Sequence, residues 1–202
     1  MKQLLLDIKP DALPTLQNFV VGNNAEALNS LNGLKNGTAQ TKFIYLWGDK
    51  GSGKSHLLLA CKALNIRVAD NVHLLNNDAQ IDLFNQYNQL KESGIPFVTA
   101  GLNPPTQMNL RADLATRLAW GLVYQLQPLS DNEKAIALNN HACERGMRLP
   151  TEVLDYCLRY LRRDLPTLMA TLDALDVWSL TTQKPITVPM LRKLLQLNLE
   201  ID

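Results

Sequence analysis

The chain has 202 residues, 46% of them hydrophobic, and a formal net charge of +1. This length and composition support a hydrophobic core in one or two domains, and the charge gives no indication of binding to nucleic acid or to an anionic membrane. The apolar run at positions 4–6 is too short for a signal peptide or a membrane span, so we expect a soluble cytoplasmic protein. Its cysteines lie far apart and are expected to be reduced thiols buried in helices: Cys61, Cys143 and Cys157.

The N-terminal stretch 3–8 is unusual because it is short and apolar and is followed at once by Pro10 and Pro14. From these residues alone two interpretations stay open. The stretch can be a short edge strand or a flap over the core. It can equally be an extended peptide that docks in the apolar pocket of another protein.

Residues 48–55 have the G-x-x-x-x-G-K-S pattern of a phosphate-binding P-loop. A β-rich apolar run, 42–47, precedes the pattern and a helix-favouring run, 56–64, follows it, which is the context that the motif needs. Backbone N–H groups and the positive end of the helix can then hold phosphate oxygens, with Lys54 reaching the terminal phosphates and the Ser55 hydroxyl binding Mg²⁺. The expected nucleotide contacts in the loop are Gly48, Asp49, Lys50, Gly51, Ser52, Gly53, Lys54 and Ser55.

A second strand, expected at 65–71, carries Asp70 near its end, where it can help to hold Mg²⁺. Residues 56–69 alone separate Ser55 from Asp70, and one helix takes about ten of them. No room remains for a further strand and helix. The two strands are therefore expected to be connected directly, in a parallel sheet that lacks one edge strand.

Periodicity and capping residues predict the rest of an α/β core. Asn23 or Asn24 can cap a helix, and Trp47 and Trp120 are expected to pack around the P-loop strand and the following turn. The first helix would bury Ala27, Leu28, Leu31 and Leu34. A helix at 78–90 would face inward through Ile81, Phe84, Tyr87 and Leu90 or Leu83. The core would continue with a strand at 95–101, a helix at 111–118 and a strand at 122–126.

Beyond Pro128 the periodicity is helical only. A capping box, Ser130 with Glu133, opens the first of four expected helices. These helices span 130–146, 150–162 and 164–180, and the last begins at Pro189. The expected organisation is an N-terminal peptide at 1–12, a P-loop α/β core at 13–128 and a C-terminal helical lid at 129–202.

Several segments resemble DnaA, the bacterial replication initiator and AAA+ ATPase. Residues 117–122, with an aspartate before them and a proline after, resemble its arginine-finger segment, and residues 19–24 resemble its adenine-side segment. Residues 145–150 and 163–165 resemble its lid. The chain ends at Asp202 without a DNA-binding helix-turn-helix, and together with residues 3–8 this combination resembles the Hda family of DnaA inactivators.

This resemblance implies a regulatory adaptor. A peptide formed by Gln3, Leu4, Leu6 and Ile8 would bind the DNA polymerase III β sliding clamp. Arg117 would act as an arginine finger in trans on ATP bound to DnaA, and its alternative is a surface salt bridge. On the adenine side, ADP or ATP with Mg²⁺ would contact Phe19, Val20 and Asn24. DNA would be reached only through the clamp, no membrane contact is implied, and a homodimer stays open.

Some positions depart from an active ATPase. Asn71 stands where a second acid should follow Asp70, unless Asn76 and Asn77 form the pair, and an amide cannot act as a base. Pro166 stands where a lid arginine should touch phosphate, although Arg162 or Arg163 could substitute; Asn103 is the nearest polar residue to the end of the third core strand. We expect weak or no hydrolysis by the chain itself. The alternatives are an autonomous weak ATPase and a DnaA-like DNA-recruiting or loader protein.

Overall fold

The computed structural model describes residues 13–161 and 164–199, and two units divide this part of the chain. Leu13–Pro128 form the first unit, and the residues from Leu129 onward belong to the second. The peptide at 3–8, with Gln3, Leu4, Leu6 and Ile8, lies outside the described residues, as do Arg162 and Arg163.

A four-stranded parallel sheet in the order β2-β3-β1-β4 forms the centre of the first unit. The strands are β1 (Phe43–Trp47), β2 (Arg67–Ala69), β3 (Phe97–Gly101) and β4 (Leu122–Gln125). Phe43 and Arg67 both pair with Phe97, so β3 lies between β1 and β2. The expected direct connection from the P-loop helix to β2 is present, and β2 is an edge strand of three residues, shorter than the predicted 65–71.

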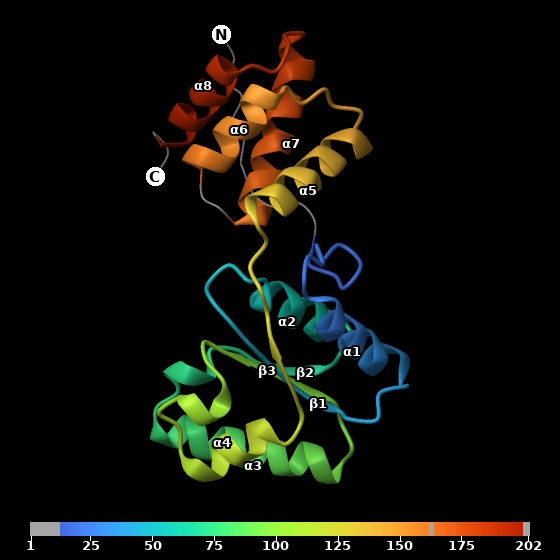
Figure 1. The fold of residues 1–202 in the computed structure, drawn as a ribbon, viewed down its shortest axis with the longest axis vertical. Helices are drawn as coiled ribbons and strands as arrows, with labels where there is room; N and C mark the ends of the chain where they lie inside the picture. Colours follow the sequence, from blue (N-terminus) through green and yellow to red (C-terminus); the bar gives the residue numbers. More distant parts are fainter. Residues whose placement is uncertain (1–12, 162–163, 200–202) are drawn as a thin grey trace. The chain divides into compact units, whose positions relative to one another are not determined.

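Helices cover both faces of this sheet (Figure 1). One face carries α1 (Ala25–Asn36) and α2 (Lys54–Ala63), and the other carries α3 (Asn77–Glu92) and α4 (Ala112–Ala119). Two short 3₁₀ helices, η1 (Val72–Leu74) and η2 (Pro105–Gln107), lie in the connections. The cluster on the α1 and α2 side includes Leu31, Ile44, Leu46, Leu57 and Val98, and the other includes Tyr45, Leu83, Tyr87, Phe97 and Leu114.

The buried face of α3 differs from the predicted one. Gln80, Leu83, Tyr87 and Leu90 are buried, whereas Ile81 is 36% exposed. The helix begins after Asn76, whose side chain accepts a hydrogen bond from the Ala79 N–H at 2.9 Å. A polar residue therefore takes the inward position that periodicity assigned to Ile81, because the Gln80 amide has hydrogen-bond partners within the unit.

The second unit contains the four expected helices, α5 (Asp131–Glu144), α6 (Thr151–Tyr160), α7 (Leu165–Thr182) and α8 (Val188–Leu199). The predicted capping box is present, with the Glu133 N–H donating to Ser130 Oγ at 3.2 Å and the Ser130 N–H donating to the Glu133 carboxylate at 2.7 Å. Pro166 lies in the first turn of α7, behind the N-cap Asp164. The helices enclose a core that includes Leu138, Val153, Leu168, Leu172, Leu175, Leu191 and Leu194.

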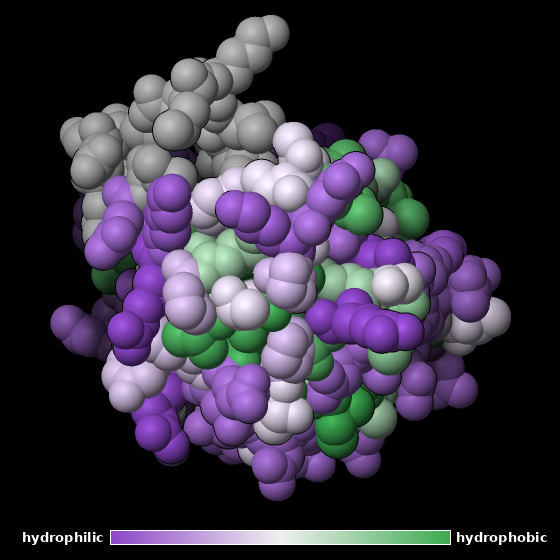
Figure 2. Space-filling view, turned by 90° about the horizontal axis from the view of Figure 1, so that it is seen from above, coloured by the Kyte–Doolittle hydropathy of each residue, from purple (hydrophilic) through white to green (hydrophobic). Residues whose placement is uncertain are grey.

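The molecular surface is mixed in character. The face in Figure 2 is mostly hydrophilic, with apolar patches between the polar side chains, as is normal for a folded domain. Across 13–161 and 164–199, the helices fall short of the combined length and hydropathy that crossing a membrane requires.

Candidate nucleotide site and arginine helix

The P-loop links β1 to α2 and has the backbone that its glycines permit. Gly48, Gly51 and Gly53 have φ of 145°, 87° and 96°, in a region that side chains rarely adopt. A Cβ at Gly53 would lie 2.7 Å from the Phe19 ring, and one at Gly48 would collide with the Leu126 carbonyl oxygen. The loop can therefore approach both neighbours only because these positions are glycine, and α2 begins directly after it.

Lys54 lies inside the loop. Its Nζ donates hydrogen bonds to the carbonyl oxygens of Gly48 at 2.6 Å and Asp49 at 2.8 Å. Burial lowers the pKa of this ammonium, and the negative charges of Asp70 and Asp49 act in the opposite direction. The Lys54 ammonium therefore lies against backbone carbonyl groups of the P-loop, at the place where a phosphate would bind.

Ser55 and Asp70 come together as the sequence predicts. The Ser55 hydroxyl donates a hydrogen bond to Asp70 Oδ2 at 3.2 Å, and Asp70 Oδ1 accepts one from the Asn71 N–H at 2.7 Å. A hydroxyl and a carboxylate are suitable oxygen ligands for Mg²⁺, which otherwise keeps waters and nucleotide phosphates in its coordination shell. Within the described ranges, no group of three His, Cys, Asp or Glu residues could hold a metal by itself. The oxygen atoms of Ser55 and Asp70 fit a Mg²⁺ ion that is also bound by a nucleotide.

The second position of the acidic pair is occupied by an amide in an unusual backbone conformation. Asn71 has φ of 53°, in the left-handed region that asparagine tolerates better than most residues. The alternative pair does not lie at this strand end, because Asn76 caps α3 and Asn77 is its first residue. Asp70 is therefore the acidic side chain that follows β2 beside the P-loop.

Of the residues expected on the adenine side, Phe19 lies next to the P-loop. Phe19 is buried, and its ring centroid lies 5.5 Å from that of His56, whose Nε2 is 2.9 Å from the Thr15 carbonyl oxygen. Val20 is half-buried. The ring of Phe19 thus packs on the start of α2, directly beside Gly53 of the loop.

Asn24 has a different contact from the predicted helix cap. It occupies the N-cap position of α1, yet its side chain makes no capping hydrogen bond. Its amide instead donates to the Gln127 carbonyl oxygen at 2.9 Å and accepts from the Gln127 N–H at 2.7 Å. Because both ends of the buried amide are occupied, Asn24 holds the segment after β4 against the start of α1.

Arg117 lies on α4 and is partly buried. Its Cζ lies 4.0 Å from the Trp120 ring centroid and 5.5 Å from that of Phe84. Its Nε is buried without a hydrogen-bond partner, and among the residues that the structure describes no carboxylate forms an ion pair with it. The alternative of a surface salt bridge is therefore wrong within this part of the chain, because aromatic rings take the place of an acid.

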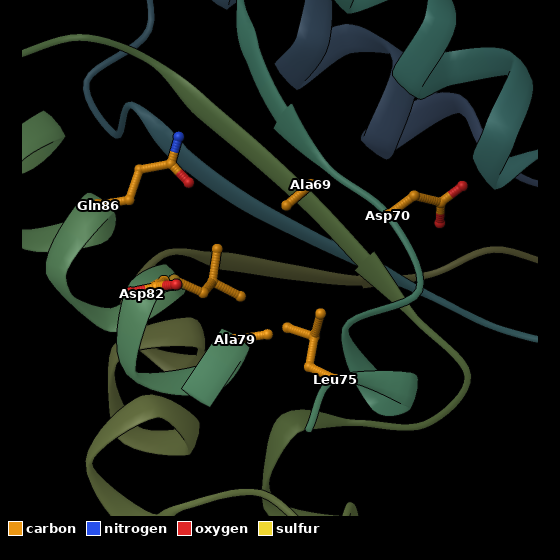
Figure 3. Close-up of a pocket in the computed structure, with 7 residues that line it drawn as sticks. Ala69, Asp70, Leu75, Ala79, Asp82 and Gln86 are labelled. Atoms are coloured by element: carbon orange, nitrogen blue, oxygen red, sulfur yellow. The ribbon is translucent and has the colours of Figure 1, made fainter. Parts of the chain in front are cut away.

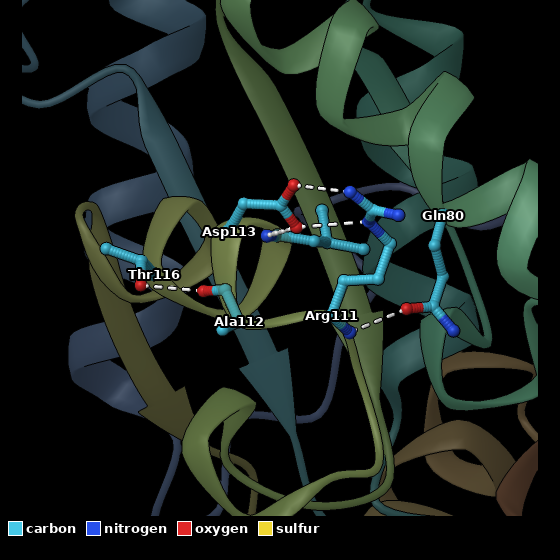
Figure 4. Close-up of polar contacts among 6 residues, drawn as sticks. Gln80, Arg111, Ala112, Asp113 and Thr116 are labelled. Atoms are coloured by element: carbon cyan, nitrogen blue, oxygen red, sulfur yellow. Dashed lines mark hydrogen bonds and ion pairs between the residues drawn. The ribbon is translucent and has the colours of Figure 1, made fainter.

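The N-terminal end of α4 is anchored by the buried side chain of Gln80. Its Nε2 donates to the Leu75 carbonyl oxygen at 3.0 Å. Its Oε1 accepts from the Arg111 N–H at 2.8 Å (Figure 4). Gln80 thereby ties α3, the segment after η1 and the start of α4 together. Sequence patterns did not single out Gln80, although its spacing with Leu83, Tyr87 and Leu90 follows helical periodicity.

An ion pair reinforces the same end of the helix. Arg111 Nη2 lies 2.9 Å from Asp113 Oδ2, and Arg111 Nε donates to Asp113 Oδ1 at 3.2 Å (Figure 4). The hydrogen bonds from Arg111 hold the pKa of the Asp113 carboxyl below its usual value. The charge of Arg111, at the N-cap of α4, is therefore neutralised by Asp113, whereas Arg117 has no such acid partner among the described residues.

Comparison with known proteins gives a partial family relation. Residues 131–195, about a third of the chain, match the family model described as Hda, lid domain. This match supports a relation of the chain to Hda and DnaA. The matched segment covers most of the helical second unit, from the start of α5 into α8.

Solved structures support the same fold. Domain III of the replication initiation protein DnaA from Thermotoga maritima matches with a TM-score of 0.71 and 22% identity, over 90% of this chain and 95% of that one. AMPPCP-bound DnaA from Aquifex aeolicus matches with a TM-score of 0.67 and 20% identity, over 83% of this chain and 66% of that one. A variant of RuvB from Thermotoga maritima matches with a TM-score of 0.64 and 15% identity, over 94% of this chain and 72% of that one.

The lengths of these relatives differ. This chain covers nearly all of the isolated DnaA domain III, but only 66% of two longer DnaA chains, which is just under two thirds of their length. The predicted parallel α/β AAA+ core with a helical lid is confirmed.

The backbone after β3 is held by a side chain of β1. The Tyr45 hydroxyl donates to the Asn103 carbonyl oxygen at 2.9 Å, and a Cβ at Gly101 would collide with this hydroxyl. Burial raises the pKa of Tyr45 above its ordinary value. Tyr45 thus fixes the backbone after β3, while the Asn103 side chain is exposed at this turn.

An open hollow of about 400 Å³ lies along the edge strand, between β2 and α3 (Figure 3). Its apolar lining includes Ala69, Leu75, Ala79 and Leu83, and its polar lining comprises Asp70, Asp82 and Gln86. The Asp70 carboxylate points away from Leu75 and Ala79, which agrees with its hydrogen bond from Ser55. The hollow and the P-loop are therefore on different sides of the β2 end.

Proposed function

We propose that this Hda-related chain is a regulatory adaptor that promotes hydrolysis of ATP bound to DnaA, with Arg117 as an arginine finger supplied in trans. The observation that carries the proposal is the Arg117 guanidinium, which stacks on Trp120 at 4.0 Å and pairs with no acid among the described residues. An arginine that keeps its charge uncompensated can stabilise the negative charge on a transferring phosphoryl group. The result would be negative regulation of replication initiation.

The P-loop is proposed to bind nucleotide as a ligand that stabilises the fold. ADP or ATP would lie against Phe19 and the loop, and Mg²⁺ would be held by Ser55 and Asp70 together with phosphates and waters. A ligand that binds only the folded state raises stability by mass action, without any turnover. The bound Mg²⁺ would neutralise phosphate charge.

Weak turnover by the chain itself follows from its departures from an active ATPase. Asn71 provides an amide where a second carboxylate would orient or deprotonate a water. Pro166, exposed in the first turn of α7, provides no charge for the terminal phosphates. The reacting phosphate is therefore assigned to DnaA, and this chain is assigned the stimulating cation.

The clamp contact is proposed from the sequence alone. Gln3 would hydrogen-bond at the rim of a pocket on the β sliding clamp, and Leu4, Leu6 and Ile8 would fill apolar subsites. Such docking would restrict the adaptor to clamps that are loaded on DNA. DNA would then be a neighbour of the complex and not a direct ligand of this chain.

Two variants test the two halves of the proposal. Gln3→Ala/Leu4→Ala is expected to lose binding to DNA-loaded clamp, whereas Arg117→Ala is expected to bind the clamp normally and to lose stimulation of ATP hydrolysis on DnaA. Arg111→Ala is the matched control, because it removes an arginine beside the same helix that is already paired with Asp113. Clamp binding by Gln3→Ala/Leu4→Ala would contradict the clamp-binding peptide. Full stimulation by Arg117→Ala would contradict the arginine finger.

An autonomous weak ATPase is the second candidate, and the hydrogen-bonded Ser55–Asp70 pair behind an intact P-loop favours it. The purified chain with Mg²⁺ and ATP is the test. Multiple turnover in the absence of DnaA, abolished by Lys54→Ala, would support this candidate against the adaptor.

A further inference from the structure

The cationic side chains of Lys91 and Arg117 both lie over the exposed indole ring of Trp120. It follows directly after α4 and is 51% exposed, which is high for a tryptophan that packs on its own domain. Arg117 Cζ lies 4.0 Å and Lys91 Nζ lies 3.8 Å from its ring centroid. The predicted packing of Trp120 around the P-loop strand is therefore wrong, because the indole instead meets charged groups from two helices.

The contacts fix the indole from both α3 and α4. Lys91 belongs to the last turn of α3, and Arg117 belongs to the last turn of α4. The backbone N–H of Trp120 also donates a hydrogen bond to the Arg117 carbonyl oxygen at 3.2 Å. Phe84, on α3, adds a second and more distant ring to Arg117 at 5.5 Å. The guanidinium is thus restricted by aromatic surfaces and not by hydrogen bonds to a described partner side chain.

Stacking and salt bridging have different consequences for an arginine. A carboxylate neutralises the charge and occupies the donors at the edge of the guanidinium, as Asp113 does for Arg111. An aromatic face attracts the charge but contacts the plane of the group, so that the terminal nitrogens keep their donors at the edge. Arg117 has its Nε turned into the protein without a partner, and its remaining donors are not used by any described carboxylate.

We propose that Trp120 is a positioning residue that holds Arg117 in the orientation needed to reach a phosphate on a neighbouring molecule, and that Lys91 fixes the indole in turn. This inference rests on the proposed function, since it specifies how the arginine finger is prepared. Holding a long side chain before the encounter reduces the entropy lost on reaching the transition state. Trp120 therefore acts through Arg117 and contacts no reacting atom.

The test measures single-turnover hydrolysis of ATP on DnaA against the concentration of this protein, in the presence of DNA-loaded clamp. Trp120→Leu removes the aromatic face, and Trp120→Phe keeps one. We expect Trp120→Leu to lower the maximal rate about ten-fold with an unchanged half-saturating concentration, and Trp120→Phe to stay within about three-fold of the original rate. Lys91→Gln, which leaves the ring in place, is expected to lower the maximal rate about two-fold.

The outcomes separate this inference from the proposed function. Loss of stimulation in Arg117→Ala together with a full rate in Trp120→Leu would overturn the positioning role alone. Full stimulation in Arg117→Ala would overturn both. A faster rate in Trp120→Leu would mean that the indole restrains Arg117, and a change confined to the half-saturating concentration would mean that it is a contact with DnaA. Either result overturns the proposal.

A folding defect is tested separately. If Trp120→Leu unfolds, Lys91→Gln and Trp120→Phe still decide the question, because both leave an aromatic ring beside Arg117. In the Trp120→Leu/Arg117→Ala double variant the loss is expected to equal that of Arg117→Ala alone. Additive losses would show that Trp120 acts independently of Arg117 and would overturn the inference.

Discussion

The Ser55 hydroxyl donates a hydrogen bond to the Asp70 carboxylate at 3.2 Å, and this contact joins the first turn of the P-loop helix to the end of an edge strand. Because one short segment connects the two elements, the pair forms without the additional strand and helix that the sequence has no room for. Asp70 is further held by the Asn71 N–H, so its carboxylate is oriented toward the hydroxyl before any ion arrives.

The first prediction concerns this pair. Asp70→Asn keeps the size of the side chain but removes its charge, so we expect the Mg²⁺-dependent part of nucleotide affinity to fall by about ten-fold. Titration of a fluorescent ADP analogue with Mg²⁺ and with a chelator measures this part. Asp82→Asn, in the nearby hollow on α3, is the control and should bind as the unmodified chain does. If Asp70→Asn lowered the affinity for the ADP analogue equally in the presence of the chelator, a role of Asp70 in binding Mg²⁺ would be contradicted.

The second prediction compares two glycines of the P-loop. Gly51→Ala and Gly53→Ala both place a side chain at positive φ, but only the new Cβ of Gly53→Ala meets the Phe19 ring, at 2.7 Å. Gly53→Ala should therefore lower the free energy of unfolding by about 1–3 kcal/mol more than Gly51→Ala does. Thermal melting measures the difference, and Phe19→Leu should partly restore the Gly53→Ala variant. Equal melting temperatures for the two alanine variants would show that Phe19 is not in close contact.

A third prediction concerns Gln80, which anchors the N-terminal end of α4. Gln80→Leu leaves the Leu75 carbonyl and the Arg111 N–H without their partner, which should cost about 1–3 kcal/mol in unfolding free energy. The Arg111 amide hydrogen should also exchange faster with solvent. Gln86→Leu, an exposed position on the same helix, is the control. An unaltered exchange rate at Arg111 would refute the bridging role of Gln80.

The fourth prediction concerns thiol reactivity. Burial raises the pKa of Cys61 from 9.0 to about 12 and that of Cys157 from 9.0 to about 11, whereas Cys143 is exposed. The thiolate is the reactive form, so at a pH well below 9.0 Cys61 should be about a thousand-fold and Cys157 about a hundred-fold poorer in thiolate than a thiol with the ordinary pKa. One fast equivalent of a thiol reagent per folded chain is expected, and Cys143→Ser should remove it. Fast labelling that survives Cys143→Ser would contradict the burial of the other two.

Local patterns predicted the elements whose cause lies within a few residues. The P-loop glycines, the direct passage from α2 to β2, and the Ser130–Glu133 capping box are all present. Each depends on spacing along the chain, on backbone freedom at glycine, or on side chains three residues apart. For these features the sequence contains the whole physical reason.

Features that depend on tertiary contacts were not predictable in the same way. Periodicity placed Ile81 inward, but the buried position belongs to Gln80 because backbone groups of Leu75 and Arg111 lie within its reach. The sequence predicts Asn23 or Asn24 as the cap of α1, but the Asn24 amide pairs with Gln127, 103 residues away. No local pattern reports partners that are so distant along the chain.

The environment of Arg117 has the same origin. A resemblance points to Arg117 itself, whereas its stacking on Trp120 comes from the meeting of α3 with the end of α4. The sequence offered a surface salt bridge as the alternative, and the acid that is near in sequence, Asp113, pairs with Arg111 instead. That Arg117 has no acid partner among the described residues could be learned only from the folded structure.

The most direct measurement of the central claim follows ATP that has been loaded on DnaA alone. Labelled ATP is bound to DnaA, free nucleotide is removed, and conversion to ADP is followed after addition of this protein with DNA-loaded clamp. We expect the unmodified chain and Arg111→Ala to accelerate the conversion, and Arg117→Ala to lower the stimulated rate by about a thousand-fold or to the unstimulated level, whichever is reached first. Stimulation by Arg117→Ala equal to that of the unmodified chain would contradict the account.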